Sequence, residues 1–288
     1  MKKNQLIEKI IHGIFLMLGL ITVGCVLLIT VYLVISGIPA IREIGIIDFL
    51  FGKEWASTAT EAKYGILPFI LTSIYGTAGA ILIGVPVGFL TAVYLSKMAS
   101  QKVKAIMQSA VSLLAGIPSV VYGLVGMLVL VPGIRKVFDV PDGASLLAAI
   151  IVLAIMILPS IIKMSITALD AVPKEYEDAS LALGATPIET YFKVSVPAAK
   201  SGIAAAIVLG VGRAIGEAMA VMMVAGNVPN IPNSLFQSVR FLTTAVSSEM
   251  AYSSGLQRKA LFSIALVLFL FIMLINATLN FFLKGEKE

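Results

Sequence analysis

Six long apolar stretches constrain this chain more than any other feature of its sequence. They lie at residues 14–35, 68–95, 105–131, 144–168, 202–225 and 260–283. Each is long enough to cross a bilayer, for which a helix needs about 20 mostly apolar residues. In lipid, every backbone amide must find a partner within its own segment or in a closed barrel. Because the stretches lack the alternation of barrel strands, they predict an all-α integral membrane protein with six transmembrane helices in one domain, residues 1–288.

The overall composition excludes a soluble globular domain. Hydrophobic residues make up 59% of the chain and charged residues only 13%, whereas soluble domains carry about 25% charged residues. The apolar stretch at 14–35 is longer than a signal-peptide core of about 7–15 residues. No small-residue cleavage pattern follows it at once. We therefore expect a retained membrane anchor.

Lysine and arginine are distributed unevenly between the predicted loops. The termini and the loops after the second and fourth stretches hold 12 of the 21 basic residues. Basic loops resist translocation, so both termini are predicted to be cytoplasmic. The net charge of +5 mostly reflects this bias, and it gives no reason to expect a nucleic-acid partner.

Several enzyme classes are excluded by residues that the chain lacks. A lone Cys25 cannot form an internal disulfide, and a lone His12 cannot build a site from several histidines, so no metal site is expected. No G-x-x-x-x-G-K-[ST] motif occurs, so any ATP must be bound by a partner and no cofactor by this chain. An intramembrane hydrolase would need a base, and a Ser–Lys pair would have to use Lys163.

Two opposite charges lie within the fifth apolar stretch, Arg213 and Glu217. An unpaired charge at the bilayer centre costs about 2.5–3.5 kcal/mol on insertion scales, so both are expected to face protein or water. Helical spacing of four predicts that they share a face and pair. The pair could be a structural bridge that fixes helix packing. Alternatively, the guanidinium offers an anion two parallel hydrogen bonds while Glu217 holds its orientation.

Glycine and proline residues mark places where the predicted helices are thin or bent. Gly210, Gly212 and Gly216 leave one side of the fifth helix thin, so that another backbone or a solute can approach. Their GxGxxxG spacing, with no strand before it, does not match a dinucleotide-binding loop. Three prolines are predicted to interrupt the second, third and fourth helices: Pro86, Pro118 and Pro159. These kinks suit a moving bundle, but ordinary packing produces them equally well.

The cytoplasmic segment 171–201 carries a dense set of helix start and stop signals. Pro173 suits the first turn of one helix, and Gly184 suits its left-handed end. Thr186, Pro187 and Glu189 then form a capping box that starts a second helix. The segment is predicted to be a short helix, a sharp turn and a second helix. It either docks onto a cytosolic partner or lies on the lipid headgroups.

This segment resembles the EAA loop of ABC-importer permeases, in which EAA precedes a glycine by three residues and I-x-L-P follows after nine more. With the pattern aligned on Gly184, the chain has Asp178, Ala179 and Ser180 for EAA, and Val194, Val196 and Pro197 for I-x-L-P. In that family the loop inserts into a cleft of the ATP-hydrolysing subunit. The resemblance implies this coupling role for eight residues: Tyr176, Asp178, Ala179, Ser180, Gly184, Ala185, Thr186 and Pro197.

Two further stretches, LLAGIPSVVYGLVG at 113–126 and GRAIGEAMAVMMVAGN at 212–227, resemble the PstC-type subunit of the phosphate-specific permeases. The resemblance covers all six spans and implies the type I ABC importer permease (MetI-like) fold with cytoplasmic coupling helices. It also implies that Arg213 and Glu217 take part in phosphate passage by alternating access. A permease for another oxyanion, or the sister PstA-type subunit, are the alternatives.

The same resemblance implies a set of partners and a location. They are a homologous PstA-like permease subunit, two PstB-like ATPases that use ATP and Mg, and an external PstS-like phosphate-binding protein. The expected location is a bacterial or archaeal cytoplasmic membrane. External stretches 37–67 and 227–259 either dock the binding protein or cover the bundle, and residues 234–250 are predicted to form an amphipathic helix.

Overall fold

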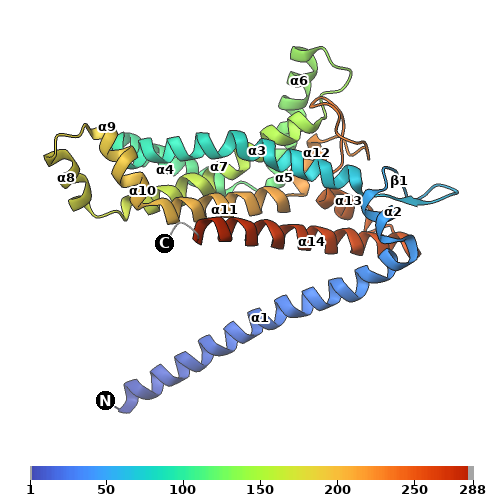
Figure 1. Ribbon diagram of the computed structural model, residues 1–288, viewed down its shortest axis with the longest axis horizontal. Coiled ribbons are helices and arrows are strands. Elements are labelled where there is room, and N and C mark those ends of the chain that lie inside the picture. Colours follow the sequence, from blue (N-terminus) through green and yellow to red (C-terminus); the bar gives the residue numbers. More distant parts are fainter. Residues whose placement is uncertain (1, 285–288) are drawn as a thin grey trace.

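The computed structural model describes the backbone of residues 2–284 and the side chains of residues 8–278. Long helices dominate it: α1 (Lys2–Ile44), α3 (Leu67–Val93), α7 (Leu146–Asp170), α11 (Lys200–Gly216) and α14 (Gly255–Lys284). Helices α3, α7, α11 and α14 lie side by side, whereas α1 leaves the bundle at an angle (Figure 1). Within the described residues, five helices are long and apolar enough to cross a membrane. The number of candidate spans rises to six if the bent pair Pro187–Ala198 and Lys200–Gly216 forms one span. The predicted fold class is confirmed.

Small residues bring α3 and α7 into close contact at the centre of the bundle. A Cβ added at Gly84 would lie 2.6 Å from Ile157 Cδ1, and one at Gly88 would lie 2.9 Å from Ile161 Cγ2. Close approach of this kind is how membrane helices pack without a hydrophobic driving force. Both α3 and α7 continue through their prolines, Pro86 and Pro159. The predicted interruption of these two helices is therefore wrong.

The third apolar stretch is broken rather than continuous, so its predicted bounds, 105–131, are wrong. Helix α4 (Gln101–Gly116) ends before Pro118, and α5 (Ser119–Val125) begins after it. A π-helical turn, Gly126–Leu130, and α6 (Val131–Phe138) extend α5 into the membrane-length helix Ser119–Phe138. Pro118 has no N–H to donate to the carbonyl four residues before it, at Leu114. That carbonyl accepts hydrogen bonds from the Ile117 N–H at 3.2 Å and from the Tyr122 hydroxyl at 2.7 Å.

One end of the bundle is closed by short elements. They are α2 (Ile46–Phe51), the antiparallel strands β1 (Trp55–Ala56) and β2 (Lys63–Tyr64), α12 (Met219–Val224) and α13 (Leu242–Glu249). Glu249 of α13 connects β1 and α14: it accepts hydrogen bonds from Trp55 Nε1 at 3.2 Å, from Gln257 Nε2 at 3.1 Å and from Arg240. Only α13 of the predicted helix 234–250 is formed. The residues before it run along the bundle as irregular backbone.

The opposite end carries a compact projection. It consists of α8 (Lys174–Ala182), α9 (Pro187–Thr190), a π-helical turn at Tyr191–Ser195 and α10 (Val196–Ala198). The amino-terminal end of α1 and the carboxy-terminal end of α14 lie toward this same end, away from α13 and the strands (Figure 1). The described ends of α1 and α14 therefore lie toward the same end of the bundle as the projection.

Helix α1 contacts the bundle only near its carboxy-terminal end. Ser263 Oγ of α14 donates a hydrogen bond to the Gly37 carbonyl, and the rings of Tyr32 and Phe262 meet edge to face at 5.6 Å. Before residue 30 every described side chain of α1 is exposed. The side chains of residues 8–29 of this apolar helix are thus not covered by the described part of the chain.

Gly123 sets the distance between α5 and α12. A Cβ there would lie 2.8 Å from Ala220 Cα. Because that atom is backbone, no flexible side chain can yield, and we expect Gly123→Ala to destabilise the fold by about 1–3 kcal/mol through overpacking. The matched control is Gly133→Ala in α6, where a Cβ meets nothing within 4 Å. Thermal unfolding of the detergent-purified chain measures both. Equal midpoints for the two variants would contradict this assignment.

Candidate functional site

Arg213 lies near the carboxy-terminal end of α11, half-buried beside α7. Its Nη1 donates to Ser160 Oγ of α7 at 3.4 Å, a long hydrogen bond, and no other hydrogen bond or ion pair of Arg213 is found among the described residues. A guanidinium carries five N–H donors in a planar fork. Among the described residues the Arg213 side chain therefore leaves most of its donors without a hydrogen-bond partner.

Glu217 does not pair with Arg213, and the predicted helical pairing is wrong. Helix α11 ends at Gly216, and Glu217 has extended backbone angles, φ −72° and ψ 128°. Its carboxylate turns to the next helix and accepts a hydrogen bond from the Ala220 N–H at 3.0 Å, and its carbonyl accepts one from Thr243 Oγ1 at 2.8 Å. The predicted span 202–225 is consequently two helices, α11 and α12, which meet at the charged residues.

The three glycines of this region have different surroundings. Gly210 is buried, and a Cβ there would lie 2.9 Å from Ile161 Cγ1, so it allows α11 to pack on α7. At Gly212 and Gly216 a Cβ would meet nothing within 4 Å. Leu209, one turn earlier, is 51% exposed. The face of α11 next to Arg213 is therefore open toward the outside of this chain.

The carboxylate of Glu217 has two separable roles, as a cap of α12 and as a charge. Glu217→Ala removes the acceptor for Ala220 N–H, and we expect it to destabilise the fold by about 1 kcal/mol, as loss of a cap does. Glu217→Gln keeps an acceptor oxygen and should unfold at the parent temperature. The comparison of thermal midpoints measures the cap alone. If Glu217→Gln is as unstable as Glu217→Ala, the charge matters more to the fold than the hydrogen bond.

The projection has the turn predicted from the sequence. Gly184 adopts φ +86°, and a Cβ there would meet nothing within 4 Å. Thr186 and Glu189 form the reciprocal capping box that starts α9. The hydroxyls of Ser180 and Thr190 lie 2.9 Å apart and connect α8 to α9. The structure therefore has the predicted short helix, turn and second helix.

Capping also sets the ionisation of Glu189. Hydrogen bonds from the Thr186 backbone N–H and hydroxyl, then from Lys193, lower the pKa of Glu189 from 4.5 to about 2. A lowered folded-state pKa adds stability above pH 4.5 that is lost as the pH falls through about 2. We expect the protection of the amides of residues 183–190, relative to their intrinsic exchange rates at each pH, to fall as the pH is lowered between these values, and Glu189→Gln to remove this change. Mass spectrometry of exchanged peptides measures it.

The projection presents one face to solvent and one to the bundle. Of the residues with a predicted coupling role, six are exposed and two half-buried. The exposed ones are Tyr176, Asp178, Ala179, Gly184, Thr186 and Pro197, and the half-buried ones are Ser180 and Ala185. Leu183 is 90% exposed at the tip. Tyr176 near the start of α8 and Leu183 at its end add exposed apolar area to the projection, and such area suits a protein partner.

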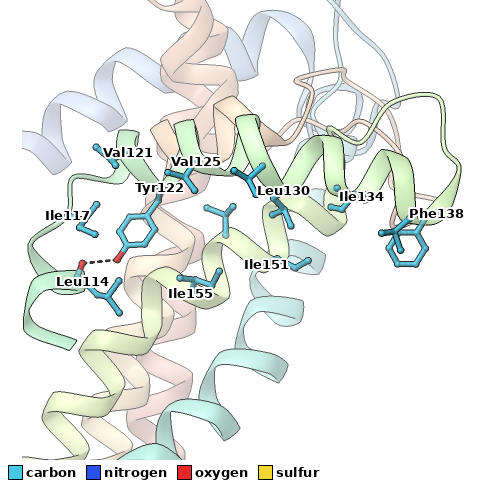
Figure 2. A pocket seen from close by; sticks show the side chains of 15 residues that line it. Leu114, Ile117, Val121, Tyr122, Val125, Leu130, Ile134, Phe138, Ile151 and Ile155 are labelled. Atoms are coloured by element: carbon cyan, nitrogen blue, oxygen red, sulfur yellow. Dashed lines mark hydrogen bonds between the residues drawn. The ribbon is translucent and has the colours of Figure 1, made fainter. Parts of the chain in front are cut away.

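A separate apolar groove of about 610 Å³ lies between α5, α6 and α7. Leu130, Ile134, Ile151 and Ile155 line it, and the Tyr122 ring lies at the end where α4 and α5 break (Figure 2). No charged residue lines this groove, and Arg213 lies outside it. It is an apolar surface of the bundle, distinct from the charged site.

Membrane-length helices, a half-buried arginine at a helix break and a rigid projection at one end define a multi-pass membrane transport subunit. Residues 84–284 match the family described as binding-protein-dependent transport system inner membrane component, and the chain belongs to this family.

Relatives in the family agree with the resemblance stated from the sequence. The probable ABC transporter permease protein YqgH of Bacillus subtilis is 41% identical over 90% of this chain and 86% of its own length. The phosphate transport system permease proteins PstC of Pasteurella multocida and Haemophilus influenzae are each 34% identical. They align with 77% and 89% of this chain, and with 75% and 86% of their own lengths. The PstC-type resemblance is thereby confirmed.

Solved structures show the same fold. The inward-facing MetNI methionine ABC transporter has a chain that is 21% identical, with a TM-score of 0.57, covering 78% of this chain and 95% of that one. A chain of an amino acid ABC transporter crystallised with histidines is 21% identical with a TM-score of 0.54, covering 76% and 92%. At this level of identity the likeness concerns the fold alone.

Proposed function

We propose that the chain is the PstC-type permease subunit of an ATP-driven importer of inorganic phosphate. The observation that carries the proposal is the Arg213 guanidinium. It is half-buried in the membrane bundle, has one long hydrogen bond among the described residues, and stands beside an open face of α11. A charge so placed is expensive unless it serves a pathway. The PstC relatives give the anion its identity as phosphate.

One chain supplies half of a pathway in this proposal. A homologous PstA-like subunit packs against the open face of α11, where Gly212 and Gly216 leave room for its backbone. Phosphate then passes between the two subunits, held transiently by two parallel hydrogen bonds from Arg213. Glu217 lies at the same break and places a negative charge near the route, which limits how tightly the anion is held.

Movement comes from other proteins in the complex. Two PstB-like ATPases bind beneath the projection and hydrolyse ATP with Mg, and a PstS-like protein delivers phosphate from outside. This chain binds no cofactor of its own. Closure of the ATPases pushes α8 to α10 and rocks the bundle about the site, which is alternating access. The proposed location of this end, with both termini, is the cytoplasm of a bacterium or archaeon, and the twelve basic residues of the termini and neighbouring loops support it.

The test uses the native complex. The chain is tagged and purified with its co-purifying subunits, which should include one second permease and an ATPase. The complex is then reconstituted in liposomes with the binding protein. We expect inorganic phosphate to stimulate ATP hydrolysis and to enter the liposomes, and sulfate to do neither. Stimulation by sulfate alone would move the chain to another oxyanion, and a PstC-like second subunit would make this chain the PstA-type partner.

A further inference from the structure

A nearly buried ion pair joins the projection to the core of the bundle. Lys97 Nζ lies 2.6 Å from Glu177 Oε1, and their side chains are only 10% and 19% exposed. The hydroxyl of Ser195, which is fully buried, donates to the same Glu177 oxygen at 2.8 Å. Both side chains of the pair are thus largely desolvated, and the Ser195 hydroxyl adds a second contact to the same carboxylate oxygen.

The three residues belong to three different elements. Glu177 is in α8, and Ser195 ends the π-helical turn that leads through α10 into α11. Lys97 is in a second π-helical turn, Tyr94–Met98, which continues α3. The triad therefore connects the projection directly to α3 and to the start of the helix that carries Arg213.

The same π-helical turn is fixed on its other side. Ser96 Oγ donates to Asp170 Oδ1 at 2.6 Å, and Lys104 Nζ lies 2.9 Å from Asp170 Oδ2. Asp170 is the last residue of α7, the helix on which α3 packs. Adjacent residues of one turn thus bind the end of α7 and the middle of α8. π-helical turns inside helices occur frequently at functional positions.

Helix α8 has little other attachment to the bundle. None of its residues is buried, and its apolar side chains Tyr176 and Leu181 are exposed. Val172, just before it, is the nearest apolar residue in the bundle core. Within the described residues, Glu177 makes the hydrogen bond and ion pair that connect α8 to the turn Tyr191–Ser195 and to the turn Tyr94–Met98.

We propose that the Lys97–Glu177–Ser195 triad is the link that makes α3 follow α8 when the ATPases close, with Glu177 as its positioning residue. The inference rests on the proposed function for the source of the movement. Removing one partner of a buried pair leaves an uncompensated charge, so the link opens readily once either side chain is changed. Phosphate imported per ATP hydrolysed should then fall about tenfold, within the range of measured coupling between sites.

A distance measurement in the assembled complex tests the link without any transported substrate. Spin labels are placed at the exposed positions Glu175 of α8 and Leu82 of α3, after Cys25 is replaced by alanine. With Lys97 and Glu177 intact, the label distance should be the same with and without ATP. With Glu177→Gln it should change on ATP binding. The charge swap Lys97→Glu with Glu177→Lys should restore the single distance and at least a third of the import per ATP.

The control is the exposed pair of Glu189 and Lys193 in the same projection, 46% and 75% exposed. Glu189→Gln should leave the label distance fixed. A fixed distance in Glu177→Gln, or normal import per ATP, would overturn the proposal. If Glu177→Gln does not assemble, an assembled charge swap decides: a fixed distance supports the link and an ATP-dependent one refutes it. If the parent complex imports no phosphate, the proposed substrate is refuted. The label distances still test the link, because they need ATP and no transported substrate.

Discussion

Replacing Arg213 by glutamine is expected to lower phosphate uptake by about 100-fold while the complex still assembles. Truncating one partner of a buried, hydrogen-bonded charge contact costs about 2–5 kcal/mol, and about 2.7 kcal/mol corresponds to this factor. Within the described chain the guanidinium has one long hydrogen bond, to Ser160. Its loss therefore removes little from the fold and much from the pathway. Arg213→Lys keeps the charge but loses the paired donors, so its phosphate uptake should lie between those of the parent and of Arg213→Gln.

Uptake into liposomes is the measurement, and co-purification of the second permease and the ATPase shows assembly. The matched control is Arg135→Gln, which removes an exposed arginine from α6. It should transport as the parent does. Parent-like uptake by Arg213→Gln would remove Arg213 from the route of the anion. Failure of that variant alone to assemble would make Arg213 a packing residue.

Replacing Gly184 by valine is expected to uncouple ATP hydrolysis from transport. Gly184 has φ +86°, which a β-branched residue adopts only under strain. A Cβ at Gly184 meets nothing within 4 Å, so the whole cost comes from the backbone and not from a clash. The strain disturbs the turn between α8 and α9. The exposed Leu183 at its tip is then presented differently to the ATPases.

Gly184→Asn is the control, because asparagine tolerates the left-handed conformation better than other side chains with a Cβ. We expect it to retain most of the parent's ATPase stimulation by the phosphate-loaded binding protein, and Gly184→Val to lose most of it. Equal stimulation by the two variants would show that the backbone of this turn does not matter for coupling. The test measures coupling directly, because position 184 does not contact the anion site.

Local chemistry made the projection predictable. Gly184 and the Thr186 to Glu189 capping box act within a few residues of one another, so their spacing in the sequence specifies their geometry. The apolar lengths of the spans are likewise local properties. Pro118 interrupts its helix as predicted. Pro86 and Pro159, by contrast, lie inside the continuous helices α3 and α7.

Contacts between distant segments produced what the sequence could not show. The residues around Glu217 favour a helix, yet α11 ends at Gly216, and the Glu217 carbonyl accepts a hydrogen bond from Thr243, 26 positions away. The pair of Lys97 and Glu177 joins residues that are 80 positions apart (177 − 97). No periodicity or motif relates such residues. They become visible only when the helices are packed.

The amino-terminal helix has a consequence for the biogenesis of the protein. In a newly made subunit that has not yet bound its partners, α1 is a long, exposed apolar helix that contacts the bundle near its carboxy-terminal end. At that stage only lipid acyl chains surround α1. Subunits without partners should therefore be prone to aggregation and to cleavage by membrane proteases. Simultaneous synthesis of the companion permease should raise the yield of intact chain above the yield obtained from the lone polypeptide.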